Sequence, residues 1–283
     1  MGGRTRGMSS SVPPALAPRS VDEVISRIRE GGRAVVALSG GVDSSMVAAL
    51  AYSALGPEAL AVTLTGPAVS GAEVSRAERV AVTIGVAHTL LRVDPLSREE
   101  YRANRPDRCY FCRSVETSVL REFGAARAAV QYLDGVHRDD LADDRPGLQA
   151  MDEAGFSHPL LWAGWGKAEI RAEARRRGLP NWDQPSDACL ASRIAHGDPV
   201  TNELLARIES AEAVLLGLGF RRVRVRVRGG TARIEVDPSE VTRLRTEPLA
   251  SEVTREVSRL GFPNVTIDPR GYPGTLRDLP VVP

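Results

Sequence analysis

The 283-residue chain has little cysteine: its three cysteines are Cys109, Cys112 and Cys189. An odd number argues against a disulfide framework, which leaves a metal or cluster site, a reactive thiol or inert burial. Long apolar runs are also missing, since none approaches the roughly 20 residues that span a bilayer. Residues 1–19 are rich in Gly, Ser, Pro and Ala and lack the apolar centre of a signal peptide. We therefore expect a disordered tail at 1–19, a cytoplasmic protein and no membrane partner.

Aromatic residues and net charge are low as well, at 5% and +1. This balance argues against a protein that coats nucleic acid generally, so nucleic acid is not the expected partner, although a local basic site is allowed. The chain is 42% apolar and 26% charged, which is typical of a packed soluble protein. Its length allows one large domain or two modest ones.

The first half of the chain alternates apolar β-type runs with helical patterns. Near-continuous apolar strands separated by helices predict an α/β, Rossmann-like domain with a parallel sheet covered on both faces. We place this domain at 20–199. The expected strands are 34–38, 59–64, 89–93 and 129–133, and the expected helices are 43–55, 69–84, 114–126 and 167–177.

A small α+β domain is expected at 200–283. Arg and Val alternate strictly over 222–228, and Gly229-Gly230 follows, so the sequence predicts a hairpin with its second strand at 231–236. The irregular stretch before this domain, 181–199, has the length of a functional loop. The other expected elements of the domain are helices at 202–218 and 238–260 and a strand at 265–268.

The most informative stretch is Ser39-Gly-Gly-Val-Asp-Ser-Ser45, between the first strand and a helix. Glycines let the backbone approach an anion, and N–H groups at the helix N-terminus point at it. Asp43 can act through Mg²⁺. Parallel sheets bind ligands beyond the carboxyl ends of their strands, where three further residues lie. The expected nucleotide-binding residues are Ser39, Gly40, Gly41, Asp43, Ser44, Ser45, Thr63, Leu64 and Gly135.

The loop contains no lysine, so it is not the phosphate loop of kinases and GTPases. SGGVDSS instead resembles the PP-loop of ATP pyrophosphatases, which cleave ATP between the α- and β-phosphates and leave AMP on a substrate. The resemblance implies ATP and Mg²⁺ as cofactors and a PP-loop fold for the first domain.

Cys109 and Cys112 form a Cys-x-x-Cys pair. Thiolates at this spacing can bind one zinc or one iron–sulfur cluster from a turn. A redox dithiol would need the pair at the start of a helix that follows a strand, a context that the sequence meets only in part. With Cys189, the pair could hold three irons of a [4Fe–4S] cluster and leave the fourth iron open. The alternative is two structural cysteines and one buried thiol.

Five segments occur in the order seen in the LarE family of sacrificial sulfur transferases, and the match covers nearly the whole chain beyond the tail. The most specific is the Asp-x-Pro-x-x-x-Cys-Leu-x-Ser-Arg-Ile string around Cys189. In that family the matching cysteine is the sulfur source, and members with the additional pair are associated with a [4Fe–4S] cluster. One departure is the segment 271–276, where the family more often continues Gly-Tyr-Arg. The segments are the PP-loop, 108–112, 134–135, 182–194 and 226–236.

The LarE resemblance implies a pyridinium mononucleotide with ring carboxylates as substrate, and a place in nickel-pincer nucleotide biosynthesis. A carboxylate is a poor electrophile, so transfer of AMP to it would provide a good leaving group before sulfur attacks. Sulfur from Cys189 alone would leave dehydroalanine, whereas sulfide from a cluster would leave the protein intact. The resemblance also implies a homo-oligomer, a sulfide donor and a downstream nickel-inserting enzyme.

Cys189, Asp43 and Arg193 are the expected catalytic residues, because Arg193 could lower a thiol pKa or hold phosphate. Arg224 and Arg226 share one strand face, where they either bind the substrate phosphate or form a solvated edge. Glu235 and Glu212 are weaker candidates for holding Mg²⁺ or orienting a substrate, and the four histidines share no metal-ligand spacing.

Three rival functions use parts of the same sequence. A PP-loop tRNA thiolase would also deliver sulfide from a three-cysteine cluster, but it should carry a basic, aromatic-laced RNA surface. A synthetase that uses ammonia would not need Cys189. A non-catalytic regulatory protein would bind ATP without releasing pyrophosphate, which the complete SGGVDSS loop argues against.

Overall fold

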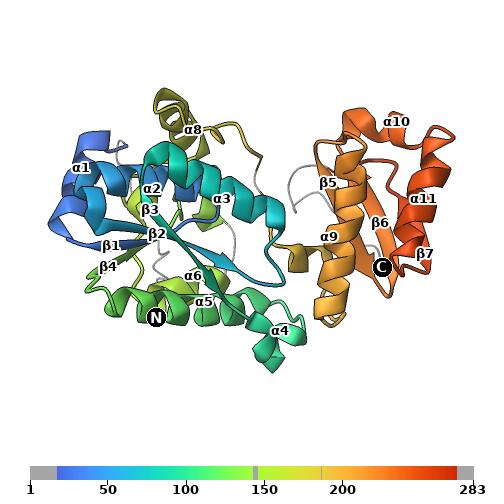
Figure 1. Ribbon diagram of the computed structural model, residues 1–283, viewed down its shortest axis with the longest axis horizontal. Helices are drawn as coiled ribbons and strands as arrows, with labels where there is room; N and C mark the ends of the chain where they lie inside the picture. Colours follow the sequence, from blue (N-terminus) through green and yellow to red (C-terminus); the bar gives the residue numbers. More distant parts are fainter. Residues whose placement is uncertain (1–17, 143–145, 186, 273–283) are drawn as a thin grey trace, which may run out of the picture.

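A computed structural model of the chain describes residues 18–142, 146–185 and 187–272. Figure 1 shows two lobes, each built around a sheet of its own, with the SGGVDSS loop in the first lobe. In the described parts of the chain, no helix combines the length and apolar character needed to cross a membrane.

The first sheet is parallel, with strand order β3-β2-β1-β4, which confirms the predicted α/β class. Its central strand β1 is buried from Ala34 to Val36, as expected for a sheet covered on both faces. The strands are β1 (Ala34–Ala37), β2 (Ala59–Thr65), β3 (Ala87–Arg92) and β4 (Gln131–Leu133).

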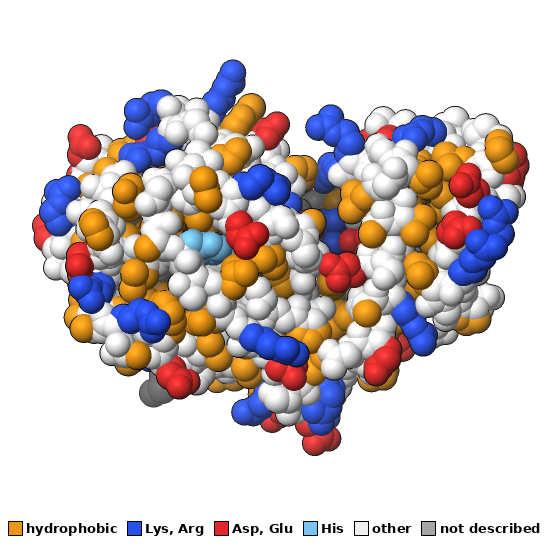
Figure 2. All heavy atoms as spheres, in the orientation of Figure 1, with side chains coloured by type: hydrophobic (Ala, Val, Ile, Leu, Met, Phe, Trp, Pro, Cys, Tyr) orange, Lys and Arg blue, Asp and Glu red, His pale blue; other side chains and the backbone are white. Residues whose placement is uncertain are grey.

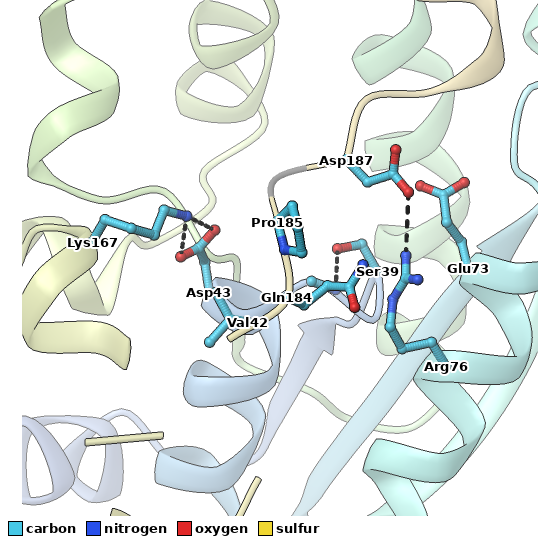
Figure 3. Close-up of a pocket in the computed structure, with 10 residues that line it drawn as sticks. Ser39, Val42, Asp43, Glu73, Arg76, Lys167, Gln184, Pro185 and Asp187 are labelled. Carbon is cyan, nitrogen blue, oxygen red and sulfur yellow. Dashed lines mark hydrogen bonds and ion pairs between the residues drawn. The ribbon is translucent and has the colours of Figure 1, made fainter. Parts of the chain in front are cut away.

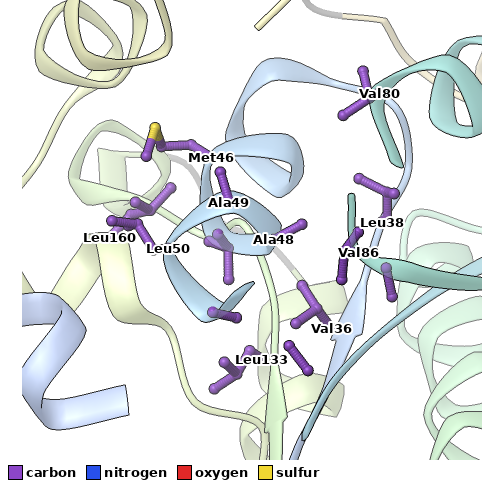
Figure 4. Close-up of a cluster of buried hydrophobic side chains, with 14 of the residues drawn as sticks. Val36, Leu38, Met46, Ala48, Ala49, Leu50, Val80, Val86, Leu133 and Leu160 are labelled. Atoms are coloured by element: carbon purple, nitrogen blue, oxygen red, sulfur yellow. The ribbon is translucent and has the colours of Figure 1, made fainter. Parts of the chain in front are cut away.

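Helix α2 (Val42–Leu55) lies at the centre of the first core, because it is apolar on nearly all sides (Figure 4). Its alanines, among them Ala48 and Ala49, are short enough to let the helix approach the sheet closely. The other long helices of this lobe are α1 (Val21–Glu30), α3 (Gly71–Ile84), α5 (Arg108–Ala125) and α8 (Lys167–Arg176), and the shorter ones are α4 (Glu99–Arg102), α6 (Pro146–Glu153) and α7 (Pro159–Trp162).

The second sheet has strand order β5-β6-β7, and the predicted hairpin forms its first two strands. Gly229 and Gly230 both have positive φ, as a tight hairpin turn of this kind requires. Valines of β5 point into the second core, while its arginines lie on the opposite face. The elements are α9 (Asn202–Gly217), β5 (Val223–Arg228), β6 (Thr231–Val236), α10 (Val241–Leu244), α11 (Leu249–Arg259) and β7 (Asn264–Ile267).

Two expectations about local structure were wrong, and helix α1 was not expected at all. Helix α5 begins at Arg108 rather than at 114, so Cys109 and Cys112 lie in its first two turns and not in a free turn. The helix expected over 238–260 is interrupted before Pro248, which cannot donate a backbone hydrogen bond. Helix α1 was missed, although Ser20 and Glu23 form a capping box at its start.

The predicted tail lies outside the described residues up to position 17, but its last residue is ordered. Arg19 donates its backbone N–H to the Ala163 carbonyl at 2.9 Å and accepts from the Trp165 indole at 2.8 Å. The domain boundary at 199/200 stays a prediction. Leu190 and Ile194, which precede it, pack into the core of the second sheet, and Ile194 forms a parallel bridge with Val227.

Candidate active site

The SGGVDSS loop leaves the start of α2 without a side-chain cap. Gly41 is the N-cap residue, and its glycine side chain cannot accept from the first N–H groups of the helix. Gly40 has φ +79°, a conformation that favours glycine, and a Cβ there would lie 2.9 Å from backbone atoms of α3. Uncapped N–H groups and the helix dipole together make this turn an anion site.

The serine hydroxyls of the loop are bonded within the loop. Ser44 and Ser45 both donate to the Gly41 carbonyl, at 3.1 and 2.7 Å, and Ser39 and Ser44 share a hydroxyl contact of 3.0 Å. In this state they shape the turn. Their predicted role as direct nucleotide ligands requires them to change partners.

Two side chains from distant segments hold the loop. Asn181 donates its amide to the Gly40 carbonyl at 2.8 Å and to the Ser45 hydroxyl at 2.9 Å. Arg76 of α3 donates through Nε to the same carbonyl at 3.1 Å. Asn181 is 3% exposed, so it positions the loop from within the protein. Sequence reasoning missed both residues.

Lys167 is the basic residue that the loop itself lacks. Its Nζ lies 2.7 and 2.6 Å from the two carboxylate oxygens of Asp43, and it is the first residue of α8. The sequence analysis assigned it no role. A signal was available, because Lys167 is the only lysine in a chain with 37 Lys and Arg residues. A lysine ammonium is a compact point charge, whereas the arginine guanidinium is a planar fork. The two side chains are therefore not interchangeable in a site of this kind.

A pocket with a volume of about 110 Å³ lies between these groups (Figure 3). Asp43 and Lys167 stand on one side of it, and Arg76 with Glu73 and Asp187 on the other. Burial raises the pKa of the Glu73 carboxyl, and the nearby charge of Asp187 raises it further. The lining residues are Ser39, Gly41, Val42, Asp43, Glu73, Arg76, Lys167, Gln184, Pro185 and Asp187.

The carboxyl ends of two other strands were expected to contribute. Gly135 lies directly against the loop, since a Cβ there would be 2.6 Å from the Ser44 nitrogen. Thr63 is buried, and its hydroxyl is bonded to the Leu38 carbonyl at 2.6 Å and to His88 at 2.8 Å, so it is engaged inside the sheet. Leu64 packs on an apolar cluster. The nucleotide-binding roles of these residues stay predictions.

Behind Gly135, His158 bridges two carboxylates. Its Nδ1 lies 2.7 Å from Asp134 and its Nε2 lies 2.8 Å from Asp152. Burial alone would lower the pKa of His158, but the hydrogen bonds and charges of the two aspartates raise it to about 9. The imidazole is therefore a cation at neutral pH and fixes Asp134 at the end of β4.

The three cysteines come from α5 and from the 3₁₀ turn Leu190–Arg193, whose N-cap is Cys189. Cys109 is exposed, while Cys112 and Cys189 are half-buried against the second core. Burial raises the pKa of both half-buried thiols. The charge of Cys189 raises that of Cys112 further, and the charge of Cys109 raises that of Cys189. Cys189 is thus close to each of the other two cysteines.

Arg224, Arg226 and Arg233 share one side of the second sheet, which we call the arginine face. Arg224 donates to Asp187 at 2.6 Å, while Arg226 and Arg233 each contact Glu235 at 2.8 Å. Glu235 is fully buried and balanced by two guanidinium groups, so we do not carry its predicted Mg²⁺ role forward. The solvated-edge alternative for Arg224 and Arg226 is wrong, because their side chains are 13% and 15% exposed.

Arg193 is 3% exposed and is held by Glu212, which accepts from its Nε at 2.9 Å and its Nη2 at 3.2 Å. Its Nη1 donates to the carbonyls of Ala188 and Cys189. Arg193 therefore fixes the backbone around Cys189 rather than contacting the thiol through a hydrogen bond. Glu212 is buried and has a defined partner in Arg193, and its predicted role in holding Mg²⁺ or orienting a substrate stays a prediction.

The surface is hollowed between the two lobes, and acidic and basic side chains meet there (Figure 2). Asp187 joins the two sides of this hollow, because it contacts Arg76 of the first lobe and Arg224 of the second. The phosphate-directed loop, the Cys189 segment and the arginine face are thereby brought to one place.

Comparison with known proteins agrees with this geometry. Residues 19–118 match the asparagine synthase family model. The chain is 32% identical over 250 residues to the pyridinium-3,5-bisthiocarboxylic acid mononucleotide synthase of Lactiplantibacillus plantarum, which covers 88% of this chain and 90% of that protein. The chain belongs to the LarE family.

Other relatives share most of this LarE-family chain. An uncharacterized protein of Synechocystis sp. is 39% identical over 240 residues, covering 85% of this chain and 90% of the relative. A tRNA-specific 2-thiouridylase of Acidiphilium cryptum is 29% identical over 303 residues, covering 85% of this chain and 84% of the relative.

The segment 271–276 departs from the family pattern. Within it, Gly271 lies against the Val236 carbonyl, and Tyr272 donates its N–H to the same carbonyl at 2.7 Å. Residues 273–276 lie outside the described residues.

Proposed function

We propose that this LarE-family chain is an ATP-dependent sulfur transferase that converts a carboxylate of a pyridinium mononucleotide into a thiocarboxylate. The observation that carries the proposal is the uncapped SGGVDSS turn in a chain that covers 90% of a pyridinium-3,5-bisthiocarboxylic acid mononucleotide synthase. The cytoplasmic location, the homo-oligomer, the sulfide donor and the nickel-inserting partner stay part of this proposal.

The first step is adenylation. A substrate carboxylate oxygen attacks the α-phosphorus of ATP, the P–O bond to the β-phosphate breaks, and pyrophosphate leaves with the bonding electrons. The N–H groups of the α2 start and the Lys167 ammonium are placed to stabilise the charge that develops on the phosphates. Mg²⁺, for which Asp43 is the available carboxylate in the loop, supplies further charge neutralisation when bound.

The second step brings sulfur to the activated carbon. If Cys189 is the donor, its thiolate displaces AMP and forms a thioester. Removal of the Cα proton then breaks the Cβ–S bond, which leaves dehydroalanine on the chain and the thiocarboxylate on the product. Burial raises the pKa of Cys189, so the thiol must lose its proton as it becomes accessible.

We also propose that Cys109, Cys112 and Cys189 hold a [4Fe–4S] cluster. The support for this proposal is that Cys112 and Cys189, from segments 77 residues apart, pack against the same core. In the described parts of the chain, no group of three His, Cys, Asp or Glu side chains is arranged for a single metal ion. The cluster would supply sulfide and spare Cys189.

The test of the function is incubation with Mg·ATP and pyridinium-3,5-biscarboxylic acid mononucleotide. The expected result is release of AMP and pyrophosphate and replacement of one oxygen by sulfur in the product mass. Cys189→Ala should keep pyrophosphate release and lose the thiocarboxylate. Hydrolysis to ADP, or no turnover, would contradict the proposal. Sulfur in tRNA instead would favour the thiouridylase alternative, which the Acidiphilium cryptum relative represents.

The source of sulfur is tested separately. Anaerobically purified wild-type protein is compared with Cys109→Ala for iron, acid-labile sulfide and the visible spectrum. Iron that is lost in the variant supports the cluster. A colourless protein, with loss of the mass of H₂S at Cys189 after one turnover, assigns the sulfur to Cys189 and contradicts the cluster.

A further inference from the structure

Asp187 is a carboxylate on which three arginines from three elements converge. Arg224 of β5 donates to its Oδ1 at 2.6 Å, and the Arg193 Nη2 lies 3.6 Å from the same oxygen. Arg76 of α3 approaches Oδ2 to 3.6 Å, as the dashed line in Figure 3 marks. One side chain at the wall of the pocket thus connects the first lobe, the Cys189 segment and the second lobe.

Two of the three arginines depend on Asp187 for a carboxylate. Arg193 is held independently by Glu212. Among the described residues, Asp187 is the only carboxylate that forms an ion pair with Arg76 or Arg224. These two side chains are 14% and 13% exposed, and at such burial a guanidinium needs an anionic partner.

The same two arginines face the places where anionic ligands are expected. Arg76 lines the pocket and holds the Gly40 carbonyl, so the phosphates of ATP would reach it. Arg224 belongs to the arginine face, where the sequence predicts that the substrate phosphate binds. Phosphate oxygens satisfy a guanidinium as a carboxylate does, and they carry more charge. Ligands therefore compete with Asp187 for its partners.

Asp187 also lies two residues before Cys189. The backbone between them is tied down by Arg193, which donates to both the Ala188 and the Cys189 carbonyls. Leu190 closes the segment by donating to the Ala68 carbonyl of the first lobe at 2.9 Å. With the arginines paired to Asp187, the Cys189 thiol is half-buried.

We propose that Asp187 is a positioning residue whose carboxylate pairs with the arginines while no ligand is bound. It holds segment 187–193 in place, with the Cys189 thiol half-buried, until the phosphates of ATP bind Arg76 instead. Binding of ATP removes one ion pair and places like charge near the carboxylate, so the segment loosens and the thiol becomes accessible. The Cys189 thiol therefore becomes accessible for sulfur transfer only after the nucleotide has bound. This inference rests on the proposed function, because it requires that the pocket bind ATP.

The experiment is hydrogen–deuterium exchange of the backbone over 187–193, with and without Mg²⁺ and an ATP analogue that has a methylene group between the α- and β-phosphates. Loss of one ion pair predicts exchange about fivefold faster when the analogue is bound. Ordinary ligand binding slows exchange, so the direction is diagnostic. Asp187→Asn should exchange fast without analogue and respond no further, and Asp187→Glu should restore the response.

Asp183→Asn is the matched control, because Asp183 is exposed and lies just before segment 187–193, and it should behave as wild type. Calorimetric titration of each sample separates two failures. If the analogue binds and exchange in wild type stays unchanged or slows, the role of Asp187 is wrong and the ATP site stands. If the analogue does not bind, both the proposed function and this inference are overturned.

Discussion

The loop at 39–45 and the arginine face are both directed at anions, but they are prepared in different ways. The loop offers backbone N–H groups at the start of α2, and no side chain caps them. The arginine face offers guanidinium groups that are already paired, Arg224 with Asp187 and Arg226 with Glu235. One site is ready for its ligand, whereas the other must exchange an internal anion for it.

The difference follows from the cost of burying each kind of donor. Backbone N–H groups carry only partial charge, and water can satisfy them at the surface until a phosphate arrives. A half-buried guanidinium carries a full charge and requires a partner. Under the proposed function, an anionic ligand of the arginine face would have to displace these carboxylates, and one of them, Asp187, belongs to the segment that carries Cys189.

The strongest way to break this comparison is to remove Lys167, whose ammonium pairs with Asp43 of the loop. Lys167→Met should lower the rate of pyrophosphate release by about 10²- to 10³-fold, because a donor aimed at the developing charge is lost. Lys167→Arg should recover part of the rate. Pyrophosphate release is followed with saturating ATP, and thermal melting confirms folding. An unchanged rate in Lys167→Met would assign the charge stabilisation to the backbone alone.

The second prediction concerns the buried ion pair between Arg193 and Glu212, beside the arginine face. Glu212→Gln leaves Arg193, which is 3% exposed, without its main carboxylate, so the free energy of unfolding should fall by about 3 kcal/mol. Urea denaturation measures this value. Glu203→Gln, on the exposed first turn of the same helix, is the control and should cost no more than about 1 kcal/mol, because it loses an interaction with the helix dipole. A loss as small as that of the control would show that Asp187 alone satisfies Arg193.

A third change tests whether the loop at 39–45 must keep its present conformation to bind ATP. Gly135→Ala places a Cβ 2.6 Å from the Ser44 nitrogen, so the first turn of α2 must shift. We expect a loss of about 1–3 kcal/mol in stability and a weaker affinity for ATP. Gly217→Ala, where a Cβ meets no atom within 4 Å, serves as the control. Unimpaired ATP affinity in Gly135→Ala would mean that the loop adapts to its ligand.

The loop could be predicted from sequence because every signal for it is local. A strand, two glycines and a helix follow one another within a few residues, and the structure places them so. The helix around Cys109 could not be placed, because its N-cap, Asp107, makes no side-chain capping bond. Lys167, Asn181 and Arg76 reach the loop from far along the chain, Lys167 from 124 residues away. Tertiary packing brings them there, and no local pattern records it.

The contacts of Asp187 with the arginine face could not be predicted from local sequence either. Its neighbours in sequence identify the Cys189 segment, but its three arginines come from α3, from a later turn and from β5. The alternation of Arg and Val predicted which side chains share a face. It did not predict which carboxylates would pair with them, because Glu235 and Asp187 belong to other elements.

The last expected effect is a pH dependence on the loop side, which is spread over several pH units. The folded-state pKa of His158 is about 9, above the value near 6.5 of an unfolded chain, so its stabilising charge is fully present below about pH 6.5 and is lost as pH rises through about 9. We expect the free energy of unfolding to fall by about 2 kcal/mol between pH 7 and 10. His158→Gln should flatten this slope. If the variant keeps the slope, titration elsewhere is responsible, and the Asp134–His158–Asp152 bridge does not fix the end of β4 behind the loop.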